Sequence, residues 1–281
     1  MSSFNFNVPR IVDLTRTLSP SKTPQTIYPG DPEFHLVPYA TISKDGYSVH
    51  NITFGTHTGT HIDAPSHFVE GGKSIDKISL DDLLGKACVI DFTRGEGGSP
   101  LRGRQKLEWE DLEGAWARRT SSLGNDSTEG VRLETSLKES LGSHQYSMLL
   151  VNTGWSDDAL TGGGQFDPTR FFGHPYFSSS IATELLLLGV KVFGTDLPNP
   201  DETPYESADP LTAESTVLGG SDGYRFHELY LAGEGLIVEN LSNLRQLGQG
   251  NGKDWVVGVI PLKLEDADGS PVRAYAYRSA D

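Results

Sequence analysis

Short apolar stretches separated by turn residues dominate the hydrophobic pattern of this chain. Alternating or continuous apolar runs of about four to eight residues are typical of strands, and apolar residues at helical spacing are typical of helices. The pattern predicts strands at 9–18, 47–54, 87–92, 147–155, 190–196, 236–238 and 254–264. It predicts helices at 80–84, near 108–118, at 179–188 and at 226–232. Because strands outnumber long helices and β–α crossovers recur, we expect a mixed α/β fold with a β-rich core and flanking helices.

Two glycines and one polar segment set further boundaries. Gly85 and Gly233 directly follow two of the predicted helices, and because glycine commonly ends a helix, we expect both helices to stop there. Residues 93–130 are rich in glycine, serine and charged side chains around a single predicted helix. We interpret them as a surface excursion from one domain spanning residues 1–281, a length that can bury a sizeable core.

Composition and charge exclude several classes of partner. Hydrophobic residues make up 36% of the chain and charged residues 22%, as in ordinary globular proteins. The formal net charge of −15 disfavours nucleic acid and anionic membranes as partners, since both require a basic surface. No apolar run approaches the ~18 to 20 residues of a membrane-spanning helix, and the first residues lack a secretory pattern. We therefore expect a cytoplasmic protein that acts on a small molecule.

Three common catalytic arrangements lack support in this sequence. The only cysteine, Cys88, lies in an apolar stretch with no polar neighbour to lower its pKa, so we expect a small buried hydrophobic residue. No GxSxG elbow is present, which argues against a serine hydrolase of that class. No GxGxxG loop is present either, which argues against a dinucleotide site.

A cluster of histidines supplies the strongest chemical signal. His57, His61 and His67 fall within eleven residues, with Asp63 among them. All four positions are odd-numbered, so in an extended segment they would share one face. A helix is not expected here, because the following Pro65 would break it.

A shared metal ion would require a bend between the first two histidines. Residues four apart on a strand lie about 13 Å apart, whereas two ligands of one ion lie at most ~4 Å apart. Gly59 can adopt the conformations that a bend demands. Asp63 could bridge two ions, and Thr58 and Thr60 could orient the imidazoles. The alternative is a surface loop that is merely rich in histidine.

The segment 57–67, HTGTHIDAPSH, resembles the HxGTHxDxPxH signature of the metal-dependent cyclase superfamily, which includes bacterial-type kynurenine formamidases and isatin hydrolases. Every fixed position of that signature is present. Three further segments resemble the same family in the same order, so that the resemblance covers about residues 10–265. They are the YPGD loop at 28–31, the GxDxPxxD element at 194–201, and a histidine followed twelve residues later by a glutamate, His227 and Glu239.

The resemblance implies a role for each matching residue. It implies a swivelling β/β/α domain that assembles as a homodimer or homotetramer. Tyr28 would line the substrate pocket, although a turn anchor is an equal alternative, and His67 would move protons. Glu239 would both bind the metal and help to shuttle the proton. The implied metal ligands are His57, His61, Asp63, His227 and Glu239.

Two departures separate the chain from the kynurenine formamidases. Position 28 is tyrosine where those enzymes typically present tryptophan, and the excursion at 93–130 is longer. Both put kynurenine formamidase activity itself in doubt, and neither affects the implied ligands.

Nitrogen and oxygen ligands of this kind suit one or two Zn²⁺ or Mn²⁺ ions per chain. We therefore predict a metal-dependent hydrolase acting on a non-peptide C–N bond of a small carbonyl compound, such as an aryl formamide, amide or lactam. A lactone hydrolase or polyketide-type cyclase would use the same site. A non-catalytic metal-binding protein is the third alternative, disfavoured because His67 accompanies all five ligand positions.

The remaining polar candidates carry weaker signals. His35 and His50 fall in or near strands, where we expect structural roles. His174 precedes a proline and is either structural or part of a pocket wall. Asp196 and Asp201 either belong to the family element or simply cap turns, as aspartates often do.

Overall fold

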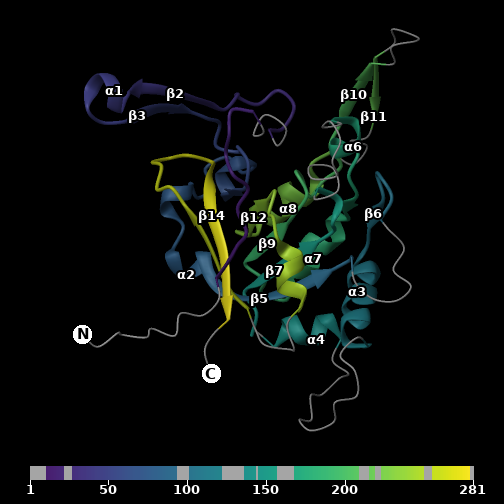
Figure 1. Cartoon of the computed structure of the whole chain (residues 1–281). Helices are drawn as coiled ribbons and strands as arrows, with labels where there is room; N and C mark the ends of the chain where they lie inside the picture. Colours follow the sequence, from purple (N-terminus) through teal and green to yellow (C-terminus); the bar gives the residue numbers. More distant parts are fainter. Residues whose placement is uncertain are drawn as a thin grey trace, which may run out of the picture.

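One closed sheet organises the fold (Figure 1). The computed structural model describes residues 11–21, 27–93, 101–121, 136–143, 145–156, 168–208, 215–218, 223–249 and 255–278. The sheet strands are β1 (Ile11–Asp13), β4 (His61–Asp63), β5 (Leu84–Asp91), β7 (Met148–Asn152), β9 (Val192–Thr195), β12 (Leu236–Glu239), β13 (Trp255–Pro261) and β14 (Gly269–Arg278). Their order is β1-β14-β13-β5-β7-β9-β12-β4, and β4 also pairs with β14. That last pairing closes the sheet into a barrel-like core.

The parallel strands β7, β9 and β12, and β5 from Ala87 onward, are buried on both faces, as their apolar sequences require. Alternate side chains of each strand enter two different clusters: Leu150 packs inside the barrel, and its neighbours Leu149 and Val151 pack outside it. The helices are α2 (Leu80–Leu83), α3 (Trp109–Ser121), α4 (Leu137–Gly142), α6 (Pro168–Phe172), α7 (Ser179–Leu187) and α8 (Arg225–Ala232). Helices α3, α4, α7 and α8 cover the outer cluster.

Several smaller elements lie outside the closed sheet. A hairpin of β2 (His35–Ala40) and β3 (Val49–Thr53), with the short helix α1 (Ile42–Asp45) at its tip, extends away from the body at the upper left of Figure 1. We call residues 35–53 the arm. The other elements are β6 (Lys106–Leu107), β8 (Tyr176–Phe177), β10 (Tyr205–Ala208), β11 (Ser215–Leu218) and the 3₁₀ turns Pro65–His67, Ile75–Lys77 and Leu244–Gln249.

The predicted mixed α/β fold is confirmed, with local corrections. Gly233 does cap α8, but Gly85 ends no helix: α2 stops at Leu83, and Gly85 lies inside β5 opposite Val257. A side chain at position 85 would overlap the hydroxyl of Ser147, so glycine is needed there to let Ser147 lie close to the β5 backbone. Strands β4 and β14 of the closed sheet were not predicted, nor were β2, β6, β8, β10 and β11 outside it.

The predicted excursion at 93–130 is only partly described. Residues 94–100 and 122–135 lie outside the described residues. The helix expected near 108–118 is α3, and it buries Leu112 and Ala115 in the outer cluster. Cys88 is buried in β5, as expected. Among the described helices, none is both long enough and apolar enough to cross a membrane.

Candidate metal centre

The bend expected at Gly59 is present and has a clear local cause. Gly59 adopts a left-handed φ of 66°, and this turn separates His57 from His61, the first residue of β4. The carbonyl oxygen of Gly59 accepts a hydrogen bond from Nδ1 of His61 at 2.9 Å. That bond fixes the imidazole and leaves its Nε2 directed toward the carboxylates of the site.

Strand pairing brings a distant glutamate to the same place. Strand β4 lies antiparallel to β12, and its register sets His61 directly opposite Glu239, so the two side chains share a face. Asp63 lies two residues after His61 and therefore on that face too, whereas Ile62 between them packs into the barrel. As a result, Nε2 of His61 lies 3.3 Å from Oε2 of Glu239 and 3.3 Å from Oδ1 of Asp63.

Helix α8 contributes His227, which a hydrogen-bonded cap on the first turn of the helix positions. Asp201 accepts hydrogen bonds from the backbone N–H of Phe226 and of His227, and from Nδ1 of His227 at 2.8 Å. The same carboxylate therefore satisfies the helix terminus and orients the imidazole. Nε2 of His227 then lies 3.2 Å from Oε1 of Glu239 and 3.5 Å from Oδ2 of Asp63.

The donor set fits a divalent metal ion. Ligand atoms about 2.0 to 2.2 Å from a common ion are expected roughly 3 to 4 Å apart, which is the spacing found among these nitrogens and oxygens. Oδ2 of Asp63 is buried and has no hydrogen-bond partner, a costly state unless a cation accompanies it. The groups His61–Asp63–Glu239 and His57–Asp63–His67 are each compact enough to hold an ion.

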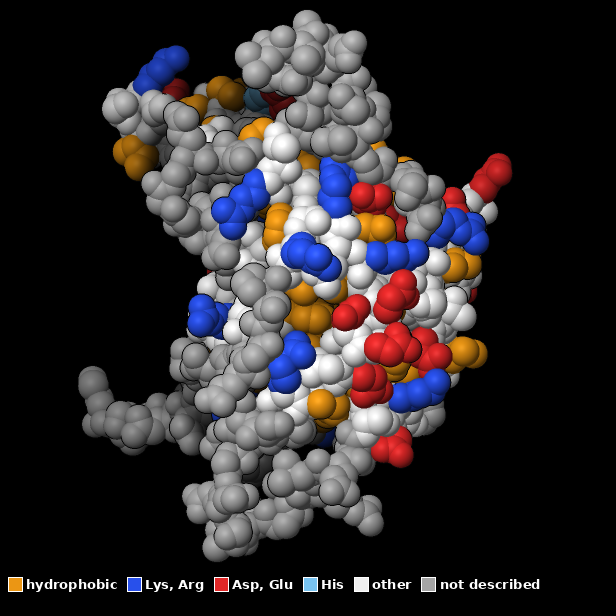
Figure 2. Space-filling model, turned by 90° about the vertical axis from the view of Figure 1, so that its right-hand side faces the viewer, with side chains coloured by type: hydrophobic (Ala, Val, Ile, Leu, Met, Phe, Trp, Pro, Cys, Tyr) orange, Lys and Arg blue, Asp and Glu red, His pale blue; other side chains and the backbone are white. Residues whose placement is uncertain are grey.

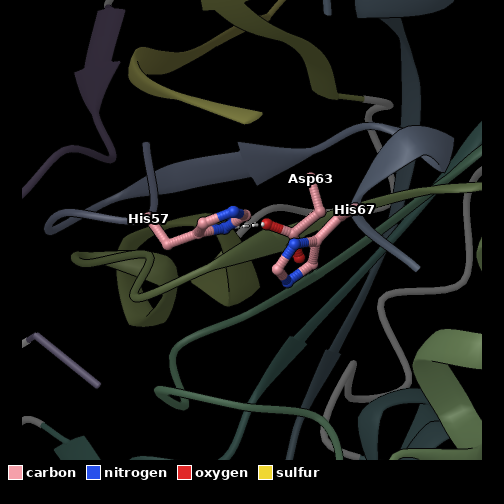
Figure 3. Close-up of side chains that lie close together, drawn as sticks. All are labelled: His57, Asp63 and His67. Atoms are coloured by element: carbon pink, nitrogen blue, oxygen red, sulfur yellow. Dashed lines mark hydrogen bonds and ion pairs between the residues drawn. The ribbon is translucent and has the colours of Figure 1, made fainter. Parts of the chain in front are cut away.

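The second of these groups lies around His57 (Figure 3). Nδ1 of His57 is 2.7 Å from Oδ1 of Asp63, and its ring stacks on that of His67 with centroids 3.9 Å apart. Oδ2 of Asp268 lies 2.9 Å from Nε2 of His57 and 3.2 Å from Nδ1 of His67. His67 is thus held by a stacked ring and a carboxylate. Whether it moves protons or binds metal stays a prediction.

Opposing effects of burial and charge set the ionisation of the site. Burial alone lowers the pKa of His57 and of His61, but the neighbouring carboxylates outweigh it and raise these pKa values to about 9 and about 10. Burial raises the pKa of Asp63, but the surrounding histidines hold it well below its usual range. The carboxylates therefore stay ionised and attract positive charge to the point where the nitrogens converge.

These residues border a pocket of about 480 Å³. All the predicted site residues line it, including Tyr28, whose hydroxyl lies 2.8 Å from that of Tyr224. Phe68 also lines the pocket and stacks on His227 at 4.8 Å. Of the two interpretations of Tyr28, the structure favours the pocket wall. Aromatic side chains beside a charged floor would suit a flat substrate with one polar group.

The structure corrects one expectation about supporting residues and decides between the alternatives for two others. Thr60 does not orient an imidazole: its hydroxyl donates to the carbonyl of Asn240, and that of Thr58 is buried without a partner. Asp196 accepts from the backbone N–H and hydroxyl of Thr153, so it stabilises a turn. Asp201, by contrast, holds His227 directly.

Three more of the described histidines lie outside the pocket, and several residues that line the pocket were not singled out from the sequence. His174 is fully buried against Thr203 and Pro175 and does not line the pocket. His35 and His50 lie exposed on the arm. Phe68, Tyr224 and Asp268 line the pocket but carry no distinctive pattern; Asp268 precedes Gly-Ser-Pro, which is typical of a turn. Asp31 also lines the pocket, and it ends the YPGD loop that the family resemblance indicates.

Comparison with known proteins agrees with this geometry. The family model described as putative cyclase matches residues 12–202. The kynurenine formamidase of Geobacillus thermodenitrificans is 29% identical over 253 residues, which cover 88% of this chain and 89% of that one. That of Bacillus cereus is 29% identical over 248 residues, covering 88% of each. Isatin hydrolase A from Ralstonia solanacearum matches with a TM-score of 0.64 and 26% identity, covering 95% of this chain and 91% of that one.

Proposed function

The chain belongs to the putative cyclase family, and we propose that it is a metal-dependent hydrolase that cleaves a non-peptide C–N bond in a small carbonyl compound. An aryl formamide, amide or lactam fits best. The observation that carries the proposal is the convergence of imidazole nitrogens and carboxylate oxygens on the unpartnered Oδ2 of Asp63 at the floor of an aromatic-walled pocket.

We propose Zn²⁺ or Mn²⁺, one or two ions per chain, held by His57, His61, Asp63, His227 and Glu239. Such an ion would polarise the substrate carbonyl and lower the pKa of water. Asp63 belongs to both candidate groups, so it would be a ligand that the two groups share. Buried carboxylates that stay ionised supply the charge that either ion requires.

His67 is the proposed carrier of the proton. The carboxylate of Asp268 accepts from its Nδ1, which leaves Nε2 to take a proton from the attacking water and return it to the leaving nitrogen. The stack on His57 restricts the ring to one plane beside the pocket. Glu239 is placed to assist the transfer, because its carboxylate also reaches the pocket.

The aromatic wall supports the choice of substrate class. Tyr28, Phe68 and Tyr224 can contact a planar ring while its carbonyl faces the charged floor. Tyr28 replaces the tryptophan typical of kynurenine formamidases, so we expect only weak hydrolysis of N-formylkynurenine. Efficient turnover of that compound, with kcat/KM above ~10⁴ M⁻¹s⁻¹, would contradict this preference.

Metal analysis and a substrate panel test the function together. Protein purified without chelator should contain about one to two divalent ions per chain, and chelation should abolish hydrolysis until metal is restored. The panel should contain aryl formamides, isatin-like lactams, amides and lactones. Hydrolysis of lactones alone would favour the rival lactone hydrolase, and a protein that stays active without metal would refute the mechanism.

We also propose that the chain works in the cytoplasm as one domain and assembles as a homodimer or homotetramer. The buried single cysteine needs no oxidising compartment. Light scattering on the purified protein tests the assembly, and a monomer of 30.5 kDa at micromolar concentration would exclude it.

A further inference from the structure

Two tyrosine hydroxyls meet in the pocket wall and are hydrogen-bonded only to each other. Tyr28 begins the loop 28–31, which a hydrogen bond from the N–H of Asp31 to the carbonyl of Tyr28 closes, and Tyr224 directly precedes α8. Their hydroxyl oxygens lie 2.8 Å apart, and both residues line the pocket. In the described part of the chain, neither hydroxyl has another hydrogen-bond partner.

A pair of phenols leaves one hydrogen unused. Each phenol carries one O–H donor and can also accept a hydrogen bond. One of the two hydrogens forms the bond between Tyr28 and Tyr224, so the other is free for a group that enters the pocket. Burial, the hydrogen bond to Tyr224 and the negative charges of Glu239 and Asp31 all raise the pKa of Tyr28. Tyr28 therefore keeps its hydrogen at neutral pH, and the pair acts as a donor.

The aromatic wall connects this donor to the metal centre. The ring centroid of Tyr224 lies 5.5 Å from that of Phe68 and 6.4 Å from that of His227. Phe68 in turn stacks on the proposed ligand His227. A substrate ring that rests on Phe68 and Tyr224 can hold its scissile carbonyl at the metal centre and present a second group to the hydroxyls.

The charge of the pocket decides which kind of group the donor can bind. On the face beside α3, Lys and Arg side chains lie among Asp and Glu side chains, except where undescribed residues cover the view (Figure 2). Among the described residues that line the pocket, by contrast, none is Lys or Arg, and four are acidic: Asp31, Asp63, Glu239 and Asp268. Asp31 is not a proposed ligand, and it ends the loop that carries Tyr28. A substrate carboxylate at the hydroxyls would meet this charge without a basic partner, whereas an uncharged carbonyl would not.

We propose that the hydroxyl pair of Tyr28 and Tyr224 selects substrates that carry a second, uncharged carbonyl oxygen on or beside the ring. The inference rests on the hydrolase proposed above and narrows its substrates to aryl formamides with an acyl substituent and lactams with a ketone. It adds one polar group to the flat substrate that the aromatic wall favours. An analogue without that oxygen is rejected because the free hydroxyl hydrogen is then buried without a partner.

Matched pairs of substrates test this selection. Formanilides with an acetyl group at the ortho, meta or para position are each compared with the isopropyl formanilide of the same pattern, which has nearly the same shape but no acceptor. The variant is Tyr28→Phe combined with Tyr224→Phe, which keeps both rings. Tyr277→Phe is the matched control, because Tyr277 is half-buried on β14 and does not line the pocket.

The measured quantity is the ratio of kcat/KM for the acetyl compound to kcat/KM for its isopropyl partner. At one ring position or more, the wild type and the control should share a high ratio, and the double variant should lower it roughly 5- to 20-fold. The intrinsic reactivity of each compound is the same for every protein, so the change reports the hydroxyls alone. It should lie mostly in KM, because the bond forms equally in the ground state and the transition state.

An unchanged ratio at all three ring positions would overturn the proposal. If the double variant then lost activity equally on both compounds, the pair would merely tie the loop 28–31 to α8. A wild type that preferred the carboxyl formanilide to the acetyl one would overturn it too.

Binding of the aniline products separates this inference from the proposed hydrolysis. Aminoacetophenones and isopropylanilines are titrated into the same three proteins and followed by NMR. The wild type and the control should bind the aminoacetophenone more tightly, and the double variant should lose that preference. If no formanilide is hydrolysed, the proposed function fails, and this binding preference alone decides whether the hydroxyl pair selects a carbonyl.

Discussion

The metal centre and the arm are neighbours in sequence and opposites in environment. Residues 57–67 bury His61 and Asp63 and half-bury two further histidines, whereas residues 35–53 expose tyrosines, isoleucines and valines. Each segment reverses the usual distribution of polar and apolar side chains. The reversal is tolerated in the centre because every buried charge faces a partner or a place for a cation. On the arm, β2 and β3 pair only with each other in the described chain, and their apolar side chains stay exposed. The buried charges of the centre thus mark the place where this chain would hold a cation.

Removing a proposed ligand from the buried segment should have the largest effect. His61→Ala deletes a nitrogen that lies between two buried carboxylates, and the cation they attract loses a ligand. We expect the metal content to fall severely and turnover to drop by roughly 10³-fold or more, since the ion supplies several kcal/mol. Elemental analysis and rate measurement on one preparation check this. Full metal content in this variant would remove His61 from the ligand set.

Removing the proposed proton carrier should separate chemistry from metal binding. In His67→Ala the five proposed ligands remain, so metal content should be unchanged while turnover falls by roughly 10²- to 10⁴-fold. The same two measurements apply, with His61→Ala as the comparison. If His67→Ala loses its metal as completely as His61→Ala, His67 is a ligand. If it keeps both metal and full activity, the proton travels through Glu239 or water instead.

A smaller effect is expected when the carboxylate that positions the rings of His57 and His67 is removed. Asp268→Ala removes the acceptor shared by His57 and His67, and we expect kcat to fall roughly 10- to 100-fold, the range typical of residues that orient ligands. Asp268→Asn keeps one oxygen and should recover part of the loss. Metal content measured on both variants shows which ring matters more: retained metal indicates His67, and reduced metal indicates His57. Wild-type kcat in Asp268→Ala would show that neither ring needs the contact.

The smallest expected effect is on the pH dependence of stability, and it comes from a buried histidine without a carboxylate partner. Burial lowers the pKa of His174 to about 4, the reverse of the shift in His57 and His61, where carboxylates prevail. The folded state therefore favours neutral His174, and its contribution to stability is complete above pH 6.5 and is lost as the pH falls toward 4. The loss at pH 5 should be about 2 kcal/mol.

Urea unfolding of the wild type and of His174→Asn, at pH 7 and pH 5, measures this contribution. The variant is less stable at pH 7, because it loses the hydrogen bonds to Pro175 and Thr203, but its stability should depend less on pH. Equal pH dependence of the two proteins would mean that His174 does not titrate on unfolding.

The sequence alone determined the local part of the site. Gly59 could bend the chain, and the alternation of His61 and Asp63 placed both on one face, because backbone freedom and side-chain period are properties of a few adjacent residues. The alternating pattern likewise predicted most strands of the sheet. The match of His227 and Glu239 to a known family named two further candidates, but gave no reason why they should lie beside His61.

Only the tertiary structure decided the rest. Glu239 reaches His61 through the register of β12 on β4, and Asp268 reaches His57 because β14 closes the sheet against β4. From the sequence, Asp201 could have been a simple turn cap. Its hydrogen bonds to His227 depend on where α8 begins. The sequence did not reveal that the arm is exposed either, because apolar β-branched and aromatic residues form the same pattern in a buried strand. Contacts across some 200 residues depend on sheet order and register, which the local pattern of a strand does not specify.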